Sequence, residues 1–354
     1  MSLASFLKKL SVPFFTGGFM IAGTSALGLC TVYTDAAIIA LVGGGFLARE
    51  LIGYAKYNGK EKLNGKTVVI TGCNTGIGFE TAKDLAQRGA RIIMACRDME
   101  RCEAAASKIK DIVNSNNVIC KKLDLSSFES IRAFCDEFNR TEARLDILIN
   151  NAGVMMCPRM LTKDGLEMQL GTNHFGHFLL TNLLLDKLKA SRPSRIVAVS
   201  SRAHTRTQGI NFDDINSEKS YEKMTAYSQS KLANILHVKE LTRRLEGTGV
   251  TAYALHPGVV ATELPRHIAL ANNPIILFLT APLRYILLKT PLEGAQTTLA
   301  CALNPAWETI SGKYYSDCKE KEPSLPAQDA EAAKRLWDVS VEITEGKRTF
   351  KTSA

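Results

Sequence analysis

Tyr227 and Lys231 lie four positions apart, about one helical turn, so a helix would place both side chains on one face. An unperturbed phenol titrates at about pH 10 and is a poor proton donor at neutral pH. A nearby ammonium favours the phenolate, so the spacing predicts that Lys231 lowers the pKa of Tyr227. The pair could then act as a general acid/base, although the same pattern also arises by chance on exposed helices.

A glycine-rich run, TGCNTGIG at residues 71–78, lies well upstream of this pair. We expect Gly72 to turn the chain tightly, Gly76 to let the backbone approach a pyrophosphate, and Gly78 to let a helix pack on a strand. The free N–H groups at the start of that helix would face phosphates. Together the two motifs predict a dinucleotide-dependent redox enzyme.

Short apolar segments alternate with helical stretches from Lys66 onward, which is typical of a parallel sheet with helices on both faces. We therefore predict an α/β fold with a Rossmann-type doubly wound sheet. Ligands of such sheets lie beyond the carboxyl ends of the strands, where the motifs fall. The predicted strands are residues 67–71, 91–96, 117–123, 145–149, 195–200 and 250–255.

The residue after the second predicted strand is Arg97. A cation at this place suits the 2′-phosphate of NADP, whereas an acid suits the ribose hydroxyl of NAD. Asp98 follows directly and keeps NAD open, but we interpret it as the cap of the next helix. The sequence thus favours NADP(H).

The amino-terminal residues 12–32 carry no charge and are long enough to cross a bilayer. A second apolar run follows at 36–48. A single anchor with an interfacial helix, a two-helix hairpin, a cleaved signal and a buried soluble helix are the alternatives, and the last two fit less well. Basic residues on both flanks, such as Lys8, Lys9 and Arg49, favour a cytosolic carboxyl-terminal part. We divide the chain into an anchor (1–55), a catalytic domain (56–340) and a tail (341–354).

The composition is globular, with 354 residues, nine cysteines and a net charge of +9. The charge suits an anionic cofactor or membrane surface, and nucleic acid is not predicted. No Cys-x-x-Cys occurs, and Cys96 and Cys120 lie in apolar runs, so we expect buried free thiols in a reducing compartment. His174 and His177 are read as polar positions of a structural helix, and no metal site is predicted.

The motifs together resemble the short-chain dehydrogenase/reductase family over roughly residues 64–340. Four shorter sequence stretches are similar to the retinol dehydrogenase 11/12/13/14 subgroup. They are ACRD at 95–98, NHFGHFLLT at 173–181, AH at 203–204 and LHPGV at 255–259. The resemblance implies a membrane-anchored, NADP-preferring enzyme that mostly reduces retinal or other apolar aldehydes.

The resemblance also implies roles for single residues. Tyr227 would be the acid/base, Lys231 would bond the nicotinamide ribose, and Ser201, next to Ser200, would hold the substrate carbonyl. Asn173 would position a water that relays protons to Lys231. Arg97 and Asn74 would meet the 2′-phosphate end, Asp124 the adenine, Asn151 and Gly153 the adenosine ribose, and Val259 and Thr262 the nicotinamide amide, beside Gly72, Thr75, Gly76, Ile77, Gly78, Pro257 and Gly258. Asp124 could also be a helix cap before Ser126 and Ser127, and it could serve in both roles.

An apolar substrate lid is expected at about residues 260–290, with Arg266, Arg284 and Lys289 resting on lipid headgroups. An oligomer contact, as in a homodimer, or ordinary core is the alternative for this segment. The stretch 201–208 is more basic than the family pattern and borders the pocket.

The predicted function is the NADP(H)-dependent interconversion of retinal and retinol, or of a similar lipophilic carbonyl and alcohol. A reductase of other lipid aldehydes, steroids or xenobiotic carbonyls is the alternative, and a noncatalytic membrane protein that binds nucleotide is a second. The expected location is the endoplasmic reticulum membrane with a cytosol-facing catalytic domain, and a mitochondrial membrane is the alternative.

Overall fold

The computed structural model describes residues 49, 54–262, 280, 284 and 287–350. The chain divides into two compact units, residues 1–51 and 52–354, and the elements below belong to the second. The predicted apolar runs at 12–32 and 36–48 lie outside the described residues, as does most of the predicted lid. Among the described ranges, none of the helices combines the length and apolarity that crossing a bilayer requires.

The described strands form one sheet in the order β3-β2-β1-β4-β5-β6-β7-β8. Neighbouring strands run parallel, except for the antiparallel pair of β7 and β8. This arrangement confirms the predicted doubly wound sheet. The bounds are β1 Thr67–Thr71, β2 Arg91–Cys96, β3 Val118–Lys122, β4 Ile147–Asn150, β5 Ser194–Val199, β6 Val250–His256, β7 Tyr314–Ser316 and β8 Lys319–Glu320.

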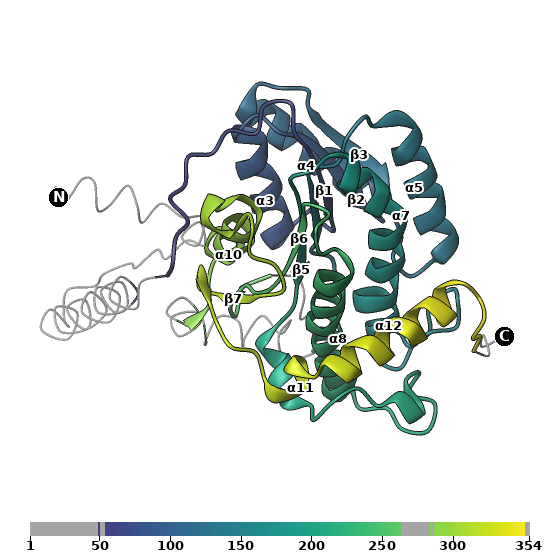
Figure 1. Ribbon diagram of the computed structural model, residues 1–354. Helices are drawn as coiled ribbons and strands as arrows, with labels where there is room; N and C mark the ends of the chain where they lie inside the picture. The colour runs from purple at the N-terminus through teal and green to yellow at the C-terminus, as the bar shows by residue number, and fades with distance from the viewer. Residues whose placement is uncertain (1–48, 50–53, 263–279, 281–283, 285–286, 351–354) are drawn as a thin grey trace, which may run out of the picture. The chain divides into compact units, whose positions relative to one another are not determined.

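Helices cover both faces of the sheet (Figure 1). One face carries α3 (Gly76–Gln87), α4 (Met99–Val113) and α10 (Pro291–Leu303). The other carries α5 (Phe128–Thr141), α7 (Gly176–Ala190), α8 (Lys223–Arg244) and α12 (Ala330–Thr344). Because both faces are buried, the central strands are almost wholly apolar, and all of β1 is inaccessible to solvent.

Short elements link these layers. Between β4 and β5, α6 (Met168–Leu170) passes through a π-helical turn (Gly171–Phe175) directly into α7. The remaining short helices are η2 (Arg202–Arg206), η3 (Phe212–Asp214), η5 (Pro305–Trp307) and α11 (Leu325–Gln328). The helix α12 continues to Thr344, so the boundary drawn at residue 340 falls inside it.

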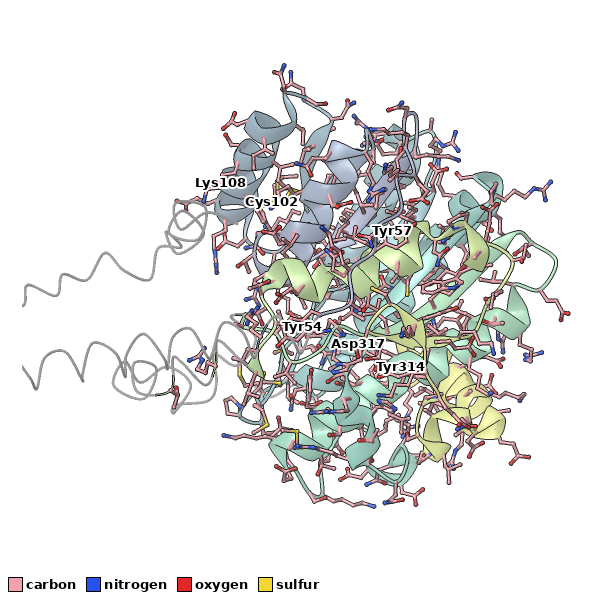
Figure 2. The ribbon with its side chains drawn as sticks, turned by 90° about the vertical axis from the view of Figure 1, so that its left-hand side faces the viewer. Tyr54, Tyr57, Cys102, Lys108, Tyr314 and Asp317 are labelled. Carbon is pink, nitrogen blue, oxygen red and sulfur yellow. A yellow bond between two sulfur atoms is a disulfide. The ribbon has the colours of Figure 1, made fainter. Side chains whose placement is uncertain are left out.

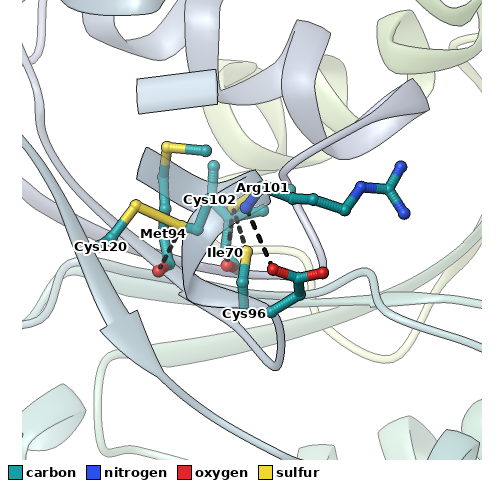
Figure 3. Close-up of a disulfide and its surroundings, with 8 residues drawn as sticks. Ile70, Met94, Cys96, Arg101, Cys102 and Cys120 are labelled. Atoms are coloured by element: carbon teal, nitrogen blue, oxygen red, sulfur yellow. Dashed lines mark hydrogen bonds between the residues drawn. A yellow bond between two sulfur atoms is a disulfide. The ribbon is translucent and has the colours of Figure 1, made fainter. Parts of the chain in front are cut away.

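One prediction about the cysteines is wrong. Cys102 on α4 and Cys120 on β3 form a disulfide, although we expected free thiols only (Figure 3). The sheet register places Cys120 beside Met94 of β2, and α4 packs over these strands, which brings the two sulfurs together. The other described cysteines are free, and all of them except Cys318 are buried.

Candidate active site

A cavity of about 560 Å³ lies beyond the carboxyl ends of the strands. Its wall contains every predicted site residue except Asn173, which is fully buried behind it. The cavity thus brings together four parts of the fold, namely the glycine turn, the end of β2, the end of β6 and the face of α8 that carries Tyr227 and Lys231. Lining residues that sequence reasoning missed include Arg101, Ser126, Met155, Met168 and Met224, whereas Arg202 and Arg206 belong to the basic stretch 201–208 that was expected to border the pocket.

The glycine turn has the geometry that a phosphate site needs. Gly72 and Gly76 both have a φ of +61°, which favours glycine. A Cβ on Gly72 would lie 2.8 Å from the Cβ of Ala152, and one on Gly78 would lie 2.7 Å from the carbonyl oxygen of Gly72. Thr75 precedes α3, and no side chain caps the first turn of this helix. The main-chain N–H groups of that turn are therefore available to an anion.

Two arginines line the same cavity as the glycine turn. Arg97 follows β2, and Arg101 lies four residues later on α4, so both line the cavity. Asp98 accepts a hydrogen bond from the Arg101 main-chain N–H at 3.1 Å and caps α4, which confirms our interpretation of Asp98. The carboxylate of Asp98 is therefore engaged by the helix, while Arg97 and Arg101 provide positive charge.

The alternative role for Asp124 as a helix cap is wrong. Ser127 caps α5 instead, by accepting the main-chain N–H of Ser130. The Asp124 carboxylate accepts the Ser126 N–H at 3.0 Å and its hydroxyl at 2.6 Å, and both residues line the cavity. Asp124 therefore shapes the loop after β3 at the edge of the site.

Asn151 joins the ends of β1 and β4. Its side-chain amide donates to the carbonyls of Thr71 at 2.8 Å and Gly72 at 3.0 Å. The main-chain N–H groups of Asn151 and Ala152 both donate to the Thr71 hydroxyl at 2.9 Å. These bonds fix the glycine turn against the loop that leads to Gly153.

The pKa of Tyr227 is raised, not lowered as predicted from Lys231. Burial raises the pKa of Tyr227 to about 12, and a hydrogen bond with the Ser201 side chain opposes this shift. Burial also lowers the pKa of Lys231 to about 8. The Lys231 ammonium lies 5.8 Å from the centre of the Tyr227 ring and donates to the Val199 carbonyl at 3.0 Å. Burial therefore decides the direction in which the pKa of the phenol moves.

The structure distinguishes the two adjacent serines. The Ser200 hydroxyl is buried and donates to the main-chain carbonyl of Lys231 at 2.6 Å, so it holds α8 against β5. The Ser201 oxygen accepts the main-chain N–H of Ala203 at 3.1 Å, and the Ser201 side chain lowers the pKa of Tyr227 across the cavity wall. Of the two serines, Ser201 is therefore the one that acts on the phenol.

His204 holds Ser201 in place. Its Nδ1 lies 2.7 Å from the Ser201 carbonyl, and its Nε2 lies 3.2 Å from the main-chain nitrogen of Ser324. A carbonyl can only accept, so Nδ1 carries the proton and Nε2 accepts the Ser324 N–H. Burial lowers the pKa of His204, which favours the neutral ring that this arrangement requires. His204 thus ties the η2 turn to the segment before α11.

Asn173 lies in the π-helical turn and supports the site from behind. Its side chain bonds both main-chain groups of Val154, at 2.8 and 2.9 Å, and donates to the Ser230 hydroxyl at 2.9 Å. A Cβ on Gly153 would lie 3.2 Å from the Asn173 amide oxygen and 3.5 Å from the Lys231 nitrogen. Asn173 therefore packs beside Lys231 across Gly153.

The two histidines of this region have structural partners. His177 bonds the Thr71 hydroxyl at 2.9 Å and the Asn173 carbonyl at 3.0 Å, and His174 bonds the Ser340 hydroxyl at 2.9 Å. Burial lowers the pKa of both rings, so they are neutral at physiological pH. They join the π-helical turn to β1 and α12.

The suggestion that Lys289 rests on lipid headgroups is wrong. Lys289 is buried, forms an ion pair with Asp317 at 2.6 Å and lies 5.5 Å from the Tyr54 ring. Its two partners, Asp317 and Tyr54, are labelled in Figure 2. Its main chain pairs with Val259 and Ala261 through a bridge between Val260 and Lys289. The ends of the 261–288 segment are therefore joined beside the cavity.

Comparison with known proteins agrees with this geometry. The family model for short chain dehydrogenases matches residues 66–272. Human retinol dehydrogenase 14 is 47% identical over 331 residues, which cover 87% of this chain and 97% of the relative. Proteins named retinol dehydrogenase 11, 12 and 13 are similar at 48–54% identity.

Solved structures show the same fold. An uncharacterized protein from Mycobacterium Paratuberculosis is 38% identical with a TM-score of 0.64, and the match covers 82% of this chain and 97% of that protein. The Pseudomonas aeruginosa RhlG/NADP complex is 27% identical with a TM-score of 0.57, and the match covers 72% of this chain and 94% of that protein. The chain therefore belongs to the short-chain dehydrogenase family of oxidoreductases and resembles its retinol dehydrogenases.

Proposed function

We propose that this chain is an NADP(H)-dependent oxidoreductase that interconverts retinal and retinol, or a similar apolar aldehyde and alcohol. The observation that carries the proposal is the single cavity wall shared by Tyr227, Ser201, Lys231 and the glycine turn. One dinucleotide and one substrate could then contact the proton donor Tyr227, the Ser201 hydroxyl that would hold the carbonyl oxygen, and the glycine turn that would hold the phosphates.

The donor set fits NADP. The uncapped start of α3 and the close approach allowed at Gly72 and Gly76 suit a pyrophosphate. Arg97 and Arg101 suit a 2′-phosphate, because guanidinium groups form strong charge-assisted bonds with phosphate oxygens. The similarity to the RhlG/NADP complex supports the same choice.

The chemistry follows from the side chains. When bound, NADPH supplies the hydride that reduces the carbonyl carbon. Ser201 holds the carbonyl oxygen, and Tyr227 delivers the proton as negative charge develops there. The raised pKa of Tyr227 keeps the phenol protonated at neutral pH, which is the state that reduction requires. Lys231, with a pKa of about 8, remains mostly cationic and would hold the nicotinamide ribose.

The remaining wall suits a lipophilic substrate. Met155, Met168 and Met224 line the same cavity, and Met224 precedes Tyr227 by one helical turn on α8. Methionine side chains are flexible and polarizable, so they adapt to extended apolar chains. The names of the similar retinol dehydrogenases support a retinoid, and other lipid aldehydes, steroids or xenobiotic carbonyls are the alternative.

We further propose that residues 1–55 anchor the protein in the endoplasmic reticulum membrane, with residues 56–340 facing the cytosol. The uncharged length of residues 12–32 and the basic flanks support this orientation. A mitochondrial membrane is the alternative, and fractionation of cells that express the tagged full chain distinguishes the two.

The test is NADPH oxidation by the detergent-solubilised full chain with all-trans-retinal, beside NADH and a short-chain aldehyde. Turnover with NADPH and retinal is the expected result. Turnover of the short aldehyde alone would keep the chemistry and reject the retinoid. Saturable NADPH binding without turnover of any carbonyl would favour the noncatalytic nucleotide-binding alternative.

A further inference from the structure

Two free cysteines face one another in the wall behind the glycine turn. Cys73 lies in the turn between β1 and α3, and Cys96 is the last residue of β2. Their sulfur atoms are 4.0 Å apart, and both side chains are buried. The parallel register of β1 and β2, extended by the Gly72 N–H bond to Ala95 at 2.9 Å, holds the two residues side by side.

The two sulfurs have different surroundings. The Cys73 thiol is the hydrogen-bonding neighbour of Cys96 and lowers the pKa of Cys96, and the main-chain groups of Cys73 and Asn74 lower it further. Burial raises the pKa of Cys73, whose sulfur also lies 3.1 Å from the Ile70 carbonyl. The pair therefore consists of two thiols 4.0 Å apart, of which Cys96 is the more acidic and Cys73 the less acidic.

Cys96 is also placed where a small oxidant can reach it. It lines the cavity directly before Arg97, although little of its surface is exposed to bulk solvent. Cys73 is not part of the cavity wall. The Cys102–Cys120 disulfide is a separate pair on α4 and β3, next to β2 (Figure 3).

We propose that Cys73 and Cys96 form an oxidative modification site that a peroxide converts to a disulfide, and that this bond opposes dinucleotide binding. The second half of this inference rests on the dinucleotide site of the proposed function. The Cys96 thiolate attacks a peroxide oxygen, the O–O bond breaks, and an alcohol or water leaves with a proton. Cys73 then attacks the Cys96 sulfenic acid, the S–S bond forms, and water leaves. Two thiols lose two electrons and the peroxide gains them.

The bond would distort the phosphate cradle. A disulfide holds its sulfurs at about 2.05 Å, so the pair must close by roughly 2 Å. The turn has little room for this movement, because a Cβ on Gly78 would already lie 2.7 Å from the Cys73 Cα. The shift would also move Cys96, which directly precedes Arg97 on the cavity wall.

The experiment uses the detergent-solubilised full chain treated with hydrogen peroxide, with and without saturating NADP⁺. Peptide mapping should show a Cys73–Cys96 cross-link that NADP⁺ suppresses and a dithiol reverses. NADPH affinity of the oxidised protein should fall by at least about tenfold. Cys73→Ala should retain its affinity after oxidation, whereas Cys135→Ala, which removes a buried thiol of α5, should lose affinity like the unsubstituted chain.

Other results would overturn the proposal. Mapping could show no cross-link, or a cross-link of Cys96 to Cys102 or Cys120 by disulfide exchange. Equal loss of affinity in Cys73→Ala would also remove it, since that variant cannot form the bond. If the untreated protein does not bind NADPH, the proposed function fails by itself. The cross-link map on the unsubstituted chain then still decides whether the modification site exists.

Discussion

The Ser201 carbonyl accepts a hydrogen bond from Nδ1 of His204 at 2.7 Å, while the Ser201 side chain lowers the pKa of Tyr227. Nε2 of the same ring accepts the Ser324 N–H at 3.2 Å. One neutral imidazole therefore connects the serine that faces the phenol with a segment more than a hundred residues away in the sequence.

His204→Asn and His204→Gln should separate the two contacts of this ring. An asparagine amide can replace Nδ1 at the Ser201 carbonyl, whereas a glutamine oxygen can replace Nε2 at the Ser324 N–H. We expect the kcat of His204→Gln to be roughly tenfold lower than that of His204→Asn, which corresponds to one lost hydrogen bond. The affinity for NADPH should be unchanged in both variants. Steady-state kinetics and NADPH titration measure this. Equal kcat values in the two variants would show that His204 does not position Ser201.

Tyr227→Phe should lower kcat by about a hundredfold or more, because the proton donor is removed. NADPH affinity should remain nearly unchanged, since the ring and its packing are kept. Tyr221→Phe is the matched control, because its hydroxyl bonds the Cys157 carbonyl at 2.8 Å and lies outside the cavity wall. Single-turnover kinetics beside NADPH titration checks both variants, and a rate close to that of the unsubstituted enzyme would remove Tyr227 as the acid.

Arg97→Asp should shift the preference from NADPH toward NADH by about tenfold or more, because a charge-assisted bond to phosphate is replaced by repulsion. Arg101→Ala should weaken NADPH binding in the same direction but less. Lys108 is exposed on α4, the helix that carries Arg101, and lies away from the cavity (Figure 2). Lys108→Ala should therefore change the affinity for neither NADPH nor NADH. Titration with both cofactors measures the ratio. An unchanged ratio in the two arginine variants would mean that other residues recognise the 2′-phosphate.

The reduction rate should depend on the charge of Lys231. Its pKa of about 8 lies far below that of Tyr227 at about 12, so Lys231 loses its proton first as the pH rises. We expect kcat/KM to be level below about pH 8 and then to fall about tenfold per pH unit. Lys231→Arg keeps the charge, so the falling limb of its residual activity should move to higher pH. If kcat/KM falls at the same pH in both proteins, a group other than Lys231 causes the fall.

Gly78→Ala should destabilise the fold and weaken NADPH binding together. The added Cβ would lie 2.6 Å from the Asn151 amide nitrogen and 2.7 Å from the Gly72 carbonyl, which costs about 1–3 kcal/mol. Gly209→Ala meets nothing within 4 Å and provides the control. Thermal unfolding of the solubilised chain reports the difference in stability. Equal melting temperatures would show that the turn can relax around a methyl group.

The sequence predicted the sheet well because its strands follow a simple rule. The runs at 67–71 and 91–96 match β1 and β2, since fully buried parallel strands are apolar throughout. The strands β7 and β8 were missed, because segments of three and two residues carry no periodic pattern. Their position depends on pairing with β6, which only the folded chain provides.

Almost all of the predicted site residues lie on the cavity wall because they follow strand ends or flank the glycine turn, but they make up fewer than half of the lining residues. Arg101 was missed although it lies one helical turn after Arg97, a spacing that could have revealed it. The disulfide of Cys102 with Cys120 depends on the packing of α4 over the sheet, which no spacing encodes. The pKa of Tyr227 was predicted in the wrong direction, because the sequence shows the charge of Lys231 and not the degree of burial.

The bridge between Val260 and Lys289 has a consequence for engineering new specificities. The Lys289 side chain lies over Gly258 and pairs with Asp317, so described residues on both sides hold the two attachment points of the intervening segment together. Doubling the length of a closed loop costs only about 0.6 kcal/mol. Segments from similar enzymes can therefore be grafted between these two residues as interchangeable modules, with the proton-donating residues left unaltered.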